Sequence, residues 1–299
     1  MASPSATMTG LTAFGRLLRL PLSGMVAVTA LAGALAAAPR LDGLSLWGLF
    51  WAIFLLSAGC SVLNQAQERF SDALMTRTCA RPLACGLIGP RHGTRIGLAC
   101  VGSGLLLLLF GSGPTTALLG LFATAWYLLV YTPLKRVTSL AVLAGTPCGI
   151  LPPLIGWQAG GAPLFTPQSL TLALILLLWQ VPHFWLLALP DRDELTLAGF
   201  KVLPAGLSNQ KILHLCHFWI LGLASASLLL PLLGLVTTPL LQVLVGTFAV
   251  SFALWATHVQ RNTLFIEPAA ARLRLGLHLY LGLLFGTVLC EALLIRLSA

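Results

Sequence analysis

Residues 44–72 read LSLWGLFWAIFLLSAGCSVLNQAQERFSD. The first twenty of them, 44–63, carry no charged side chain, and the stretch then turns abruptly polar. Twenty apolar residues in helical geometry span about 30 Å, the thickness of the hydrocarbon core of a bilayer. The stretch therefore predicts a membrane-spanning helix that carries polar side chains at one end.

Apolar runs of this length recur along the whole chain. Hydrophobic residues make up 58% of the 299 residues and charged residues only 8%, whereas a soluble domain has about 25% charged residues. The runs are too long for the roughly ten-residue strands of an outer-membrane barrel. We therefore predict an all-α polytopic membrane bundle, with residues 1–12 as a flexible N-terminal tail and 13–299 as a single transmembrane domain. Nine spans are expected, at about 17–38, 44–64, 94–112, 115–133, 139–158, 169–190, 212–235, 239–258 and 275–296.

The positive charges divide unevenly between the loops. A net charge of +9 can indicate nucleic-acid binding, but the placement of the charges argues for a different cause. If the N-terminus is cytoplasmic, 15 of the 17 Lys and Arg fall inside, and only Arg40 and Arg296 fall outside. This division follows the positive-inside rule, so it predicts an N-in, C-out topology and no nucleic-acid partner. The long inside loops after the second and sixth spans are the expected place of function.

The polar end of the opening stretch carries Asn64, Glu68 and Asp72 at intervals of four residues. On a helix this spacing stacks the three side chains along one face, about 6 Å apart in height. An acid is costly in hydrocarbon, so such a ladder is expected to face a wet cavity. Its oxygen atoms suit Mg²⁺, which binds one or two carboxylates and completes its shell with water and phosphate. A helix end in which Glu68 pairs with a nearby arginine explains the ladder equally well.

A second acidic cluster, Asp191, Asp193 and Glu194, follows the sixth expected span. The two clusters hold five of the eight carboxylates in the chain, which favours a site, and both are candidate metal-binding sets. Two such clusters with basic residues, beneath an apolar bundle, suit a lipid diphosphate whose head group binds metal and cations. The positive-inside rule alone also explains why cations lie in cytoplasmic loops, without any role in binding a ligand. The basic residues that accompany the acids are Arg77, Arg81, Lys135, Arg136 and Lys201.

A set of motifs, in order along the chain, resembles the UbiA-type intramembrane prenyltransferases. The N-x-x-x-E-x-x-x-D ladder is followed by MTRTCARPLACG (75–86), YTPLKRVTSL (131–140), GILPPLIGW (149–157), WQVPHFW (179–185) and AGFKVLP (198–204). The combination of YTPLKR with PHFW is similar to the haem-prenylating branch of that family. Two positions depart from the family pattern, because Glu194-Leu195 stands where Asp-Tyr is usual and Ala141 stands where Asn is expected.

The resemblance implies a UbiA-type fold and a Mg²⁺-dependent transfer of farnesyl from farnesyl diphosphate to a vinyl group of haem B, giving haem O. It also implies a multi-pass protein in the lipid of the bacterial inner membrane, on a pathway with haem A synthase or terminal oxidase assembly. By position, Asn64, Glu68 and Asp72 match the first acidic motif, and Asp193 and Glu194 match the second. The residues that match the diphosphate-binding bases are Arg77, Arg81, Lys135 and Arg136.

His183, within the apolar WQVPHFW segment, is a candidate substrate-binding residue, and Lys201 is a candidate at the rim. A histidine beside Pro182 could ligate haem iron or hydrogen-bond a carbonyl that the proline leaves free. A quinone-ring precursor is the alternative acceptor. A transporter is the alternative of a different class, since bundles with intramembrane acids often move ions. Against a transporter, the acids cluster at one face and only Glu291 lies within a span.

Overall fold

The computed structural model describes residues 10–38, 41–204, 206–261 and 265–298. These ranges contain helices and connecting loops but no strand. The expected tail 1–12 falls largely outside the described residues, and the first helix begins at Gly10. The helices are α1 (Gly10–Leu18), α2 (Leu20–Ala37), α3 (Gly43–Asp72), α4 (Pro90–Ser112), α5 (Pro114–Ala125), the π-helix η1 (Trp126–Tyr131), α6 (Thr132–Leu134), α7 (Ala141–Ala159), α8 (Pro167–Ala188), α9 (Arg192–Leu197), α10 (Asn209–Ser227), α11 (Leu229–Leu232), α12 (Pro239–Arg261) and α13 (Ile266–Leu297).

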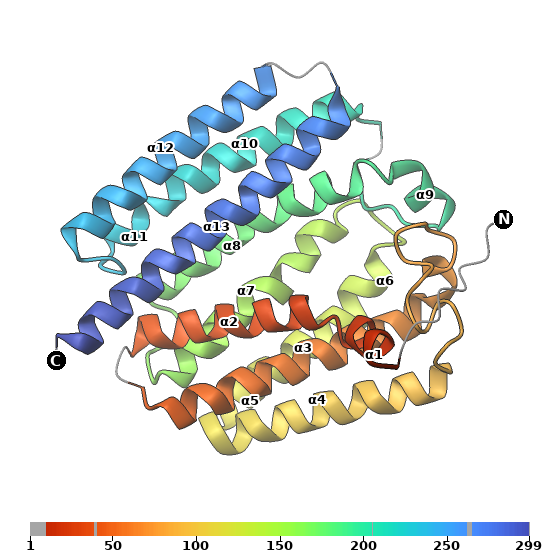
Figure 1. The fold of residues 1–299 in the computed structure, drawn as a ribbon, viewed down its shortest axis with the longest axis horizontal. Helices are drawn as coiled ribbons and strands as arrows, with labels where there is room; N and C mark the ends of the chain where they lie inside the picture. Colours follow the sequence, from red (N-terminus) through yellow and green to blue (C-terminus); the bar gives the residue numbers. More distant parts are fainter. Residues whose placement is uncertain (1–9, 39–40, 205, 262–264, 299) are drawn as a thin grey trace.

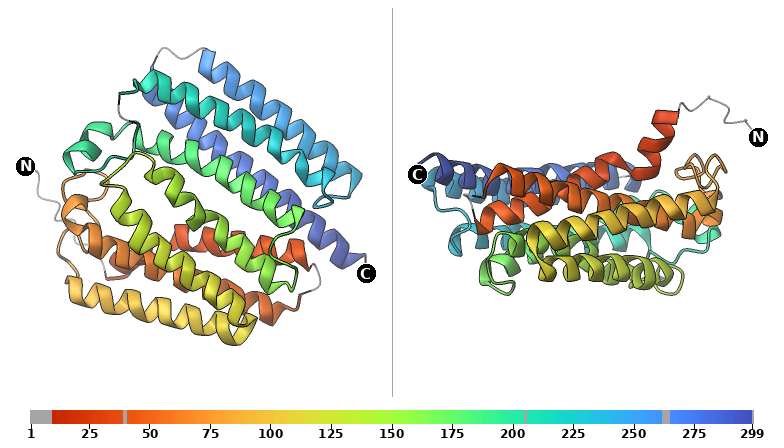
Figure 2. Two further views of the ribbon diagram at one scale, coloured as in Figure 1. Left: turned by 180° about the vertical axis from the view of Figure 1, so that it is seen from behind. Right: turned by 90° about the horizontal axis from the view of Figure 1, so that it is seen from below.

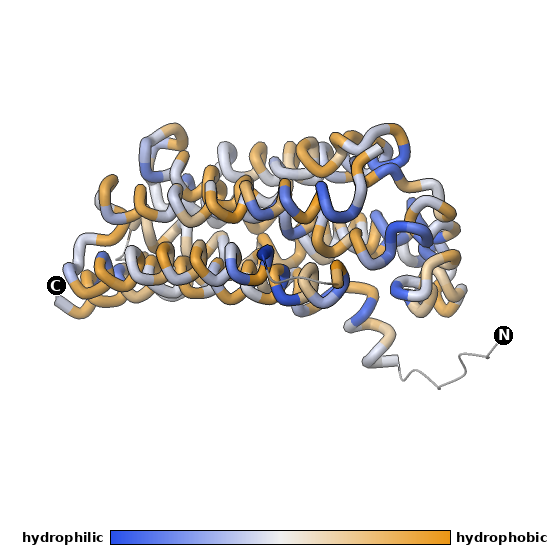
Figure 3. Tube along the Cα trace, turned by 90° about the horizontal axis from the view of Figure 1, so that it is seen from above, coloured by the Kyte–Doolittle hydropathy of each residue, from blue (hydrophilic) through white to orange (hydrophobic). Residues whose placement is uncertain are grey.

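The long helices lie side by side with their axes roughly aligned, so the bundle has two ends (Figures 1 and 2). One end holds α1, α6, α9 and the loop after α3, and the C-terminus lies at the other end (Figure 1). The more hydrophilic residues gather toward the first end (Figure 3). We call it the loop end, and it includes residues 73–89, 135–140, 189–204 and 206–208. The loops predicted to share the cytoplasm therefore share one end of the bundle, whereas Arg40 lies outside the described residues.

Within the described part of the chain, eight helical segments are long and apolar enough to cross a membrane, so this is an integral multi-pass membrane protein. The remaining expected span, 139–158, corresponds to α7, which packs against α2 and α8. Helix α7 contains three internal prolines and is not among the eight segments, so a count of nine depends on this helix. The eight segments are Leu20–Ala37, Gly43–Asp72, Pro90–Ser112, Pro114–Leu134, Pro167–Ala188, Asn209–Leu232, Pro239–Arg261 and Ile266–Leu297.

Polar side chains fix where several of these helices begin. The carboxylate of Asp42 accepts a hydrogen bond from the backbone N–H of Ser45 at 2.8 Å, which caps α3. Thr166 and Ser169 form a reciprocal capping box at the start of α8. Each cap satisfies N–H groups that the first helical turn leaves without partners.

Helices α2 and α7 approach so closely that only glycine fits at two contact points. A Cβ atom at Gly156 would lie 1.8 Å from the backbone oxygen of Ala30, and one at Gly33 would lie 2.0 Å from that of Pro153. In a bilayer, helices associate through close packing of small residues, because burial of apolar surface gives little driving force there. This contact therefore sets the position of α7 along one wall of the bundle interior.

Glu291, the acid expected within a span, lies on α13 near the end opposite to the loop end and is 3% exposed. Its carboxylate accepts hydrogen bonds from the Thr237 hydroxyl and from the Thr238 backbone N–H, the latter at 3.1 Å. Thr238 directly precedes α12, so the carboxylate caps that helix and meets its positive dipole end. These contacts give Glu291 a structural role as the cap of α12.

Candidate active site

The interior of the bundle contains a cavity of about 400 Å³ that extends to the loop end, where Arg77, Arg81 and Phe200 line it. Its walls come from α2, α3, α5, η1, α7 and α8, and Leu281 brings in α13. Apolar side chains such as Ile53, Leu56 and Leu176 line the part that lies farther from the loop end. The charged residues that line it are Arg19, Glu68, Asp72, Arg77, Arg81 and Lys135, with Asn64 beside them. The cavity thus has two parts. We call the part lined by the charged residues the mouth, and the part lined by apolar residues the chamber.

The predicted ladder on the last turns of α3 forms one wall of this cavity. Glu68 lies 2.5 Å from the ammonium of Lys135, and the side chains are 6% and 12% exposed, respectively. Arg81 places one guanidinium nitrogen 2.7 and 2.6 Å from the two carboxylate oxygens of Asp72. Burying a carboxylate without a partner is costly, so each acid is held next to its own cation.

Asn64 is hydrogen-bonded to Thr132, the first residue of α6, which directly follows the π-helix η1. Its amide nitrogen donates to the Thr132 hydroxyl at 3.2 Å, and that hydroxyl donates to the Tyr127 carbonyl at 2.8 Å. Because the Asn64 nitrogen is engaged, its carbonyl oxygen remains available as a ligand. Tyr127 and Tyr131 of this π turn both line the cavity, and π turns frequently occur at functional sites.

Lys135 follows this turn, and its ammonium lies 5.0 Å from the ring centroid of Tyr131. Burial lowers the pKa of Lys135, and the neighbouring Glu68 partly opposes that shift. The Lys135 carbonyl accepts the backbone N–H of Lys201 at 2.7 Å, while the Lys201 residue itself is exposed. Arg136 is exposed and donates to the Ser71 hydroxyl at 3.1 Å. Of the two adjacent cations, Lys135 alone lines the cavity.

The second acidic cluster links loops and does not line the cavity. Asp191 lies 3.1 Å from Arg77. Glu194 accepts hydrogen bonds from the Thr76 backbone N–H and hydroxyl, both at 2.9 Å. These contacts hold residues 75–77, which carry the cavity-lining Arg77, against α9.

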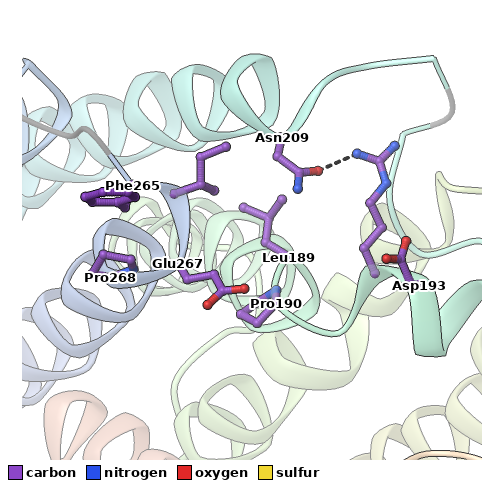
Figure 4. Close-up of a pocket in the computed structure, with 9 residues that line it drawn as sticks. Leu189, Pro190, Asp193, Asn209, Phe265, Glu267 and Pro268 are labelled. Carbon is purple, nitrogen blue, oxygen red and sulfur yellow. Dashed lines mark hydrogen bonds between the residues drawn. The ribbon is translucent and has the colours of Figure 1, made fainter.

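Asp193 lies on a separate open groove of about 660 Å³ at the loop end, together with Glu267 (Figure 4). Among the described residues, no three His, Cys, Asp or Glu side chains come together in a way that could hold a metal. The structure therefore brings Asn64, Glu68 and Asp72 to one cavity wall but does not bring Asp191, Asp193 and Glu194 to the same place. A metal at the ladder would need further ligands from a substrate.

The aromatic segment of α8 supplies another part of the wall. His183 and Trp179 both line the cavity, and their rings stack with centroids 4.5 Å apart and planes 8° apart. Gln180 donates to the carbonyls of Thr146 and Leu176, both at 3.3 Å. His214 and His217 do not line the cavity.

Arg19 is a cavity residue that motif analysis did not find. It joins α1 to α2 with φ 49° and ψ 51°, and no other non-glycine residue in the described ranges has a positive φ. Burial lowers its pKa, and Arg81 is a nearby charge that acts in the same direction. Such backbone strain persists only where its surroundings enforce it. The available signal was an arginine placed inside the apolar run 17–38, which the charge count assigned to topology alone.

The sequence model of the UbiA prenyltransferase family matches residues 26–270. The chain belongs to the UbiA prenyltransferase family. This prenyltransferase is 44% identical over 220 residues to the protoheme IX farnesyltransferase of Geobacter sulfurreducens, covering 73% of this chain and 80% of that protein. It is 37% identical over 256 residues to the protein of the same name from Nitratidesulfovibrio vulgaris, covering 85% and 89%.

Solved structures share the UbiA fold at low sequence identity. A structure reported for digeranylgeranylglyceryl phosphate synthase has a TM-score of 0.75 at 18% identity, covering 95% of this chain and 99% of that one. A UbiA homolog from Archaeoglobus fulgidus bound to GPP and Mg²⁺ has a TM-score of 0.67 at 15% identity, covering 92% and 99%. These likenesses confirm the predicted all-α UbiA-type fold.

Proposed function

We propose that this UbiA-family enzyme transfers the farnesyl group of farnesyl diphosphate to a vinyl group of protohaem IX (haem B), giving haem O. The observation that carries the proposal is one cavity in which paired acids and cations at the mouth lead into an apolar and aromatic chamber. The identity to relatives named protoheme IX farnesyltransferase supports the choice of donor and acceptor.

The diphosphate is proposed to bind at the charged mouth. Lys135, Arg81 and Arg77 line the same cavity and can share the negative charge of two phosphates. Arg136 and Lys201, at the outer surface, are proposed to extend this positive field. Breaking the bond between farnesyl C1 and oxygen places charge on the leaving diphosphate, and fixed cations stabilise that charge most where water is scarce.

Asn64, Glu68 and Asp72 fit a Mg²⁺ ion that diphosphate shares, because three oxygen-bearing side chains rise along one wall of the cavity. Mg²⁺ commonly takes only one or two carboxylates from protein and the rest of its shell from phosphate and water. When bound, the metal would offset further charge on the leaving group. Asp191, Asp193 and Glu194 remain predicted ligands of a second metal position, which a rearrangement of residues 189–208 would have to form.

The apolar chamber is proposed to hold the farnesyl chain and exclude water from the allylic cation until the acceptor reacts. The terminal vinyl carbon then forms a bond to farnesyl C1, water adds to the adjacent carbon, and a proton is released. Inorganic diphosphate is the second product. A quinone-ring precursor would use the same mouth but would need less aromatic surface than Trp179, His183 and Phe184 provide.

The loop end is proposed to face the cytoplasm of a bacterial cell whose inner membrane holds the bundle, as the division of Lys and Arg predicts. This orientation gives soluble farnesyl diphosphate access to the charged mouth. The product would pass to haem A synthase or to assembly of a terminal oxidase.

The proposed function is tested by expressing the protein in cells that lack haem O and extracting their haem. Haem O should appear with the wild-type protein, and purified protein should release diphosphate from farnesyl diphosphate only when Mg²⁺ and haem B are present. A prenylated quinone precursor in place of haem O would identify the other acceptor. Ion movement without release of diphosphate would favour a transporter.

A further inference from the structure

His183 is a cavity residue whose ring nitrogens have no partner within the described structure. Its Nδ1 is buried, and no hydrogen bond joins either ring nitrogen to another described residue. The ring is nevertheless held firmly: Trp179 stacks on it at 4.5 Å, and Trp179 is itself anchored by a 2.9 Å hydrogen bond to the Leu277 carbonyl on α13. A fixed imidazole with an unused nitrogen calls for an explanation.

His278, on α13, approaches the same ring from the side. The two imidazole centroids are 4.7 Å apart and the ring planes meet at 84°. The Nδ1 of His278 lies 2.7 Å from the Arg274 carbonyl. A carbonyl can only accept, so Nδ1 of the neutral ring carries the proton and Nε2 keeps its lone pair. This bond fixes the orientation of the His278 ring against His183.

Arg274 lies one helical turn from His278 toward the loop end, and its carbonyl is the group that His278 contacts. Spacings of four and seven residues place Arg274, His278 and the cavity-lining Leu281 on one face of α13. Arg274 is half-buried, and its guanidinium forms no ion pair or side-chain hydrogen bond with another described residue. It is therefore a cation without a carboxylate partner among the described residues, one helical turn from His278.

We propose that haem binds between α8 and α13 through two contacts, one at the iron and one at a propionate. We call this binding site, formed by His183, His278 and Arg274, the mount. His183 supplies an axial ligand to the iron, His278 positions that ring, and Arg274 binds a propionate. This inference rests on haem being the acceptor. One contact at the iron leaves a porphyrin free to turn in its own plane, whereas a second at the propionate edge fixes which vinyl group faces the diphosphate. A mount of this kind gives the enzyme a choice between the two vinyl groups.

The iron contact is tested by titrating full-length purified protein with ferric protohaem and recording its absorbance and electron paramagnetic resonance spectra. The wild-type protein should show histidine ligation, and His183→Gly should lose it and regain it with added imidazole. His217→Gly is the matched control, because His217 also has a buried Nδ1 without a partner but does not line the cavity. Metal-free protoporphyrin IX should bind wild type and His183→Gly alike. A wild-type haem spectrum in His183→Gly, or equal loss of the metal-free ligand, would overturn the iron contact.

His278 acts through His183, so its test needs a readout that packing alone would not change. His278→Ala should weaken haem binding about tenfold, as for an outer support of a metal-binding histidine, and should alter the paramagnetic spectrum of the bound haem. His278→Phe keeps a ring against His183 and should restore most of the affinity. An unchanged spectrum in His278→Ala would remove the positioning role.

The propionate contact is tested with protohaem and its dimethyl ester, which has the same iron and ring but no carboxylates. Arg274→Gln should weaken protohaem binding about tenfold or more, as expected for loss of a hydrogen bond between charged groups, and should leave binding of the ester unchanged. The control is Arg272→Gln, an exposed arginine on the same helix. Equal losses for protohaem and the ester would overturn this contact.

The outcomes separate this inference from the proposed function. If the wild-type protein makes haem O but none of the three variants changes haem binding, the mount is wrong and the function stands. If wild-type protein neither binds haem nor makes haem O, the acceptor is wrong and the mount falls with it.

Discussion

Lys135 offers a direct test of how burial tunes the diphosphate site. Its ammonium must be charged to bind an anion, and it is charged only below its pKa in the folded protein. Burial lowers that pKa, so the charge is lost at a lower pH than for an exposed lysine, whose pKa is about 10.4. Activity should therefore decline on the alkaline side below that value. Lys135→Arg should move the decline to higher pH, because guanidinium stays charged to above about 12.

Lys135→Met should show what the charge contributes. A hydrogen bond to a charged group contributes about 1.5–3 kcal/mol, so farnesyl diphosphate should bind about 10- to 150-fold more weakly. The substitution also leaves Glu68, whose side chain is 6% exposed, without its cation. Removing one partner of a buried ion pair costs about 3–5 kcal/mol of stability. The double variant Lys135→Met with Glu68→Gln should regain much of that stability but not the affinity.

The assay is diphosphate release and competition binding across pH in lipid nanodiscs, with thermal unfolding measured on the same samples. Lys211→Met is the matched control, because Lys211 is exposed at the same end and does not line the cavity. If wild type and Lys135→Arg lose activity at the same alkaline pH, Lys135 is not the titrating group. If Lys135→Met binds farnesyl diphosphate as well as Lys211→Met does, the assignment of Lys135 to the diphosphate site is refuted.

Three further predictions concern the ladder, the packing and the topology. Glu68→Ala and Asp72→Ala should each abolish Mg²⁺-dependent diphosphate release while the protein stays in the membrane fraction, since each removes an oxygen ligand from the leaving-group site; near-normal turnover would make the ladder a plain helix end. Gly156→Ala should destabilise the bundle by about 1–3 kcal/mol or more in thermal unfolding through overpacking, because the new Cβ would lie 1.8 Å from the Ala30 oxygen, whereas Gly246→Ala, with nothing within 4 Å, should not. Reporter fusions should place 71–92 and 190–211 in the cytoplasm and 159–168 and the C-terminus outside, and an acidic loop found outside would contradict the Lys and Arg rule.

Features that repeat along one helix could be predicted from the sequence, and those that depend on neighbouring helices could not. The four-residue spacing of Asn64, Glu68 and Asp72 is a local property of α3, so the common wall they form followed from helix geometry. Their cations lie 9 residues away for Asp72 and 67 residues away for Glu68. Spacing alone suggested an arginine partner for Glu68, but the structure pairs Glu68 with Lys135 and gives the arginine to Asp72.

The residues that sequence reasoning missed carry no periodic signal. Arg19 depends on a left-handed backbone at a helix junction, and His278 depends on which face of α13 meets α8. The second acidic cluster has a helix-end composition that suits metal binding, yet Asp191 and Glu194 are engaged by Arg77 and Thr76 from the other loop. Which chain segment fills the space beside a charged side chain is a tertiary property, and a single sequence does not determine it.

Each acid of the ladder is paired with its own cation, so the charges of the site are balanced before any ligand binds. A divalent ion that binds alone would have to separate Glu68 from Lys135 or Asp72 from Arg81, which leaves a buried cation without a counterion. Diphosphate that binds alone would take the cation and leave a buried acid without a counterion. Only when both arrive together do all four groups keep a counterion. Mg²⁺ and farnesyl diphosphate should therefore show positive, reciprocal coupling, each raising the affinity for the other by the same factor. Calorimetric titrations in both orders would measure that factor, and a value of one would mean that the resident pairs stay intact when the ligands bind.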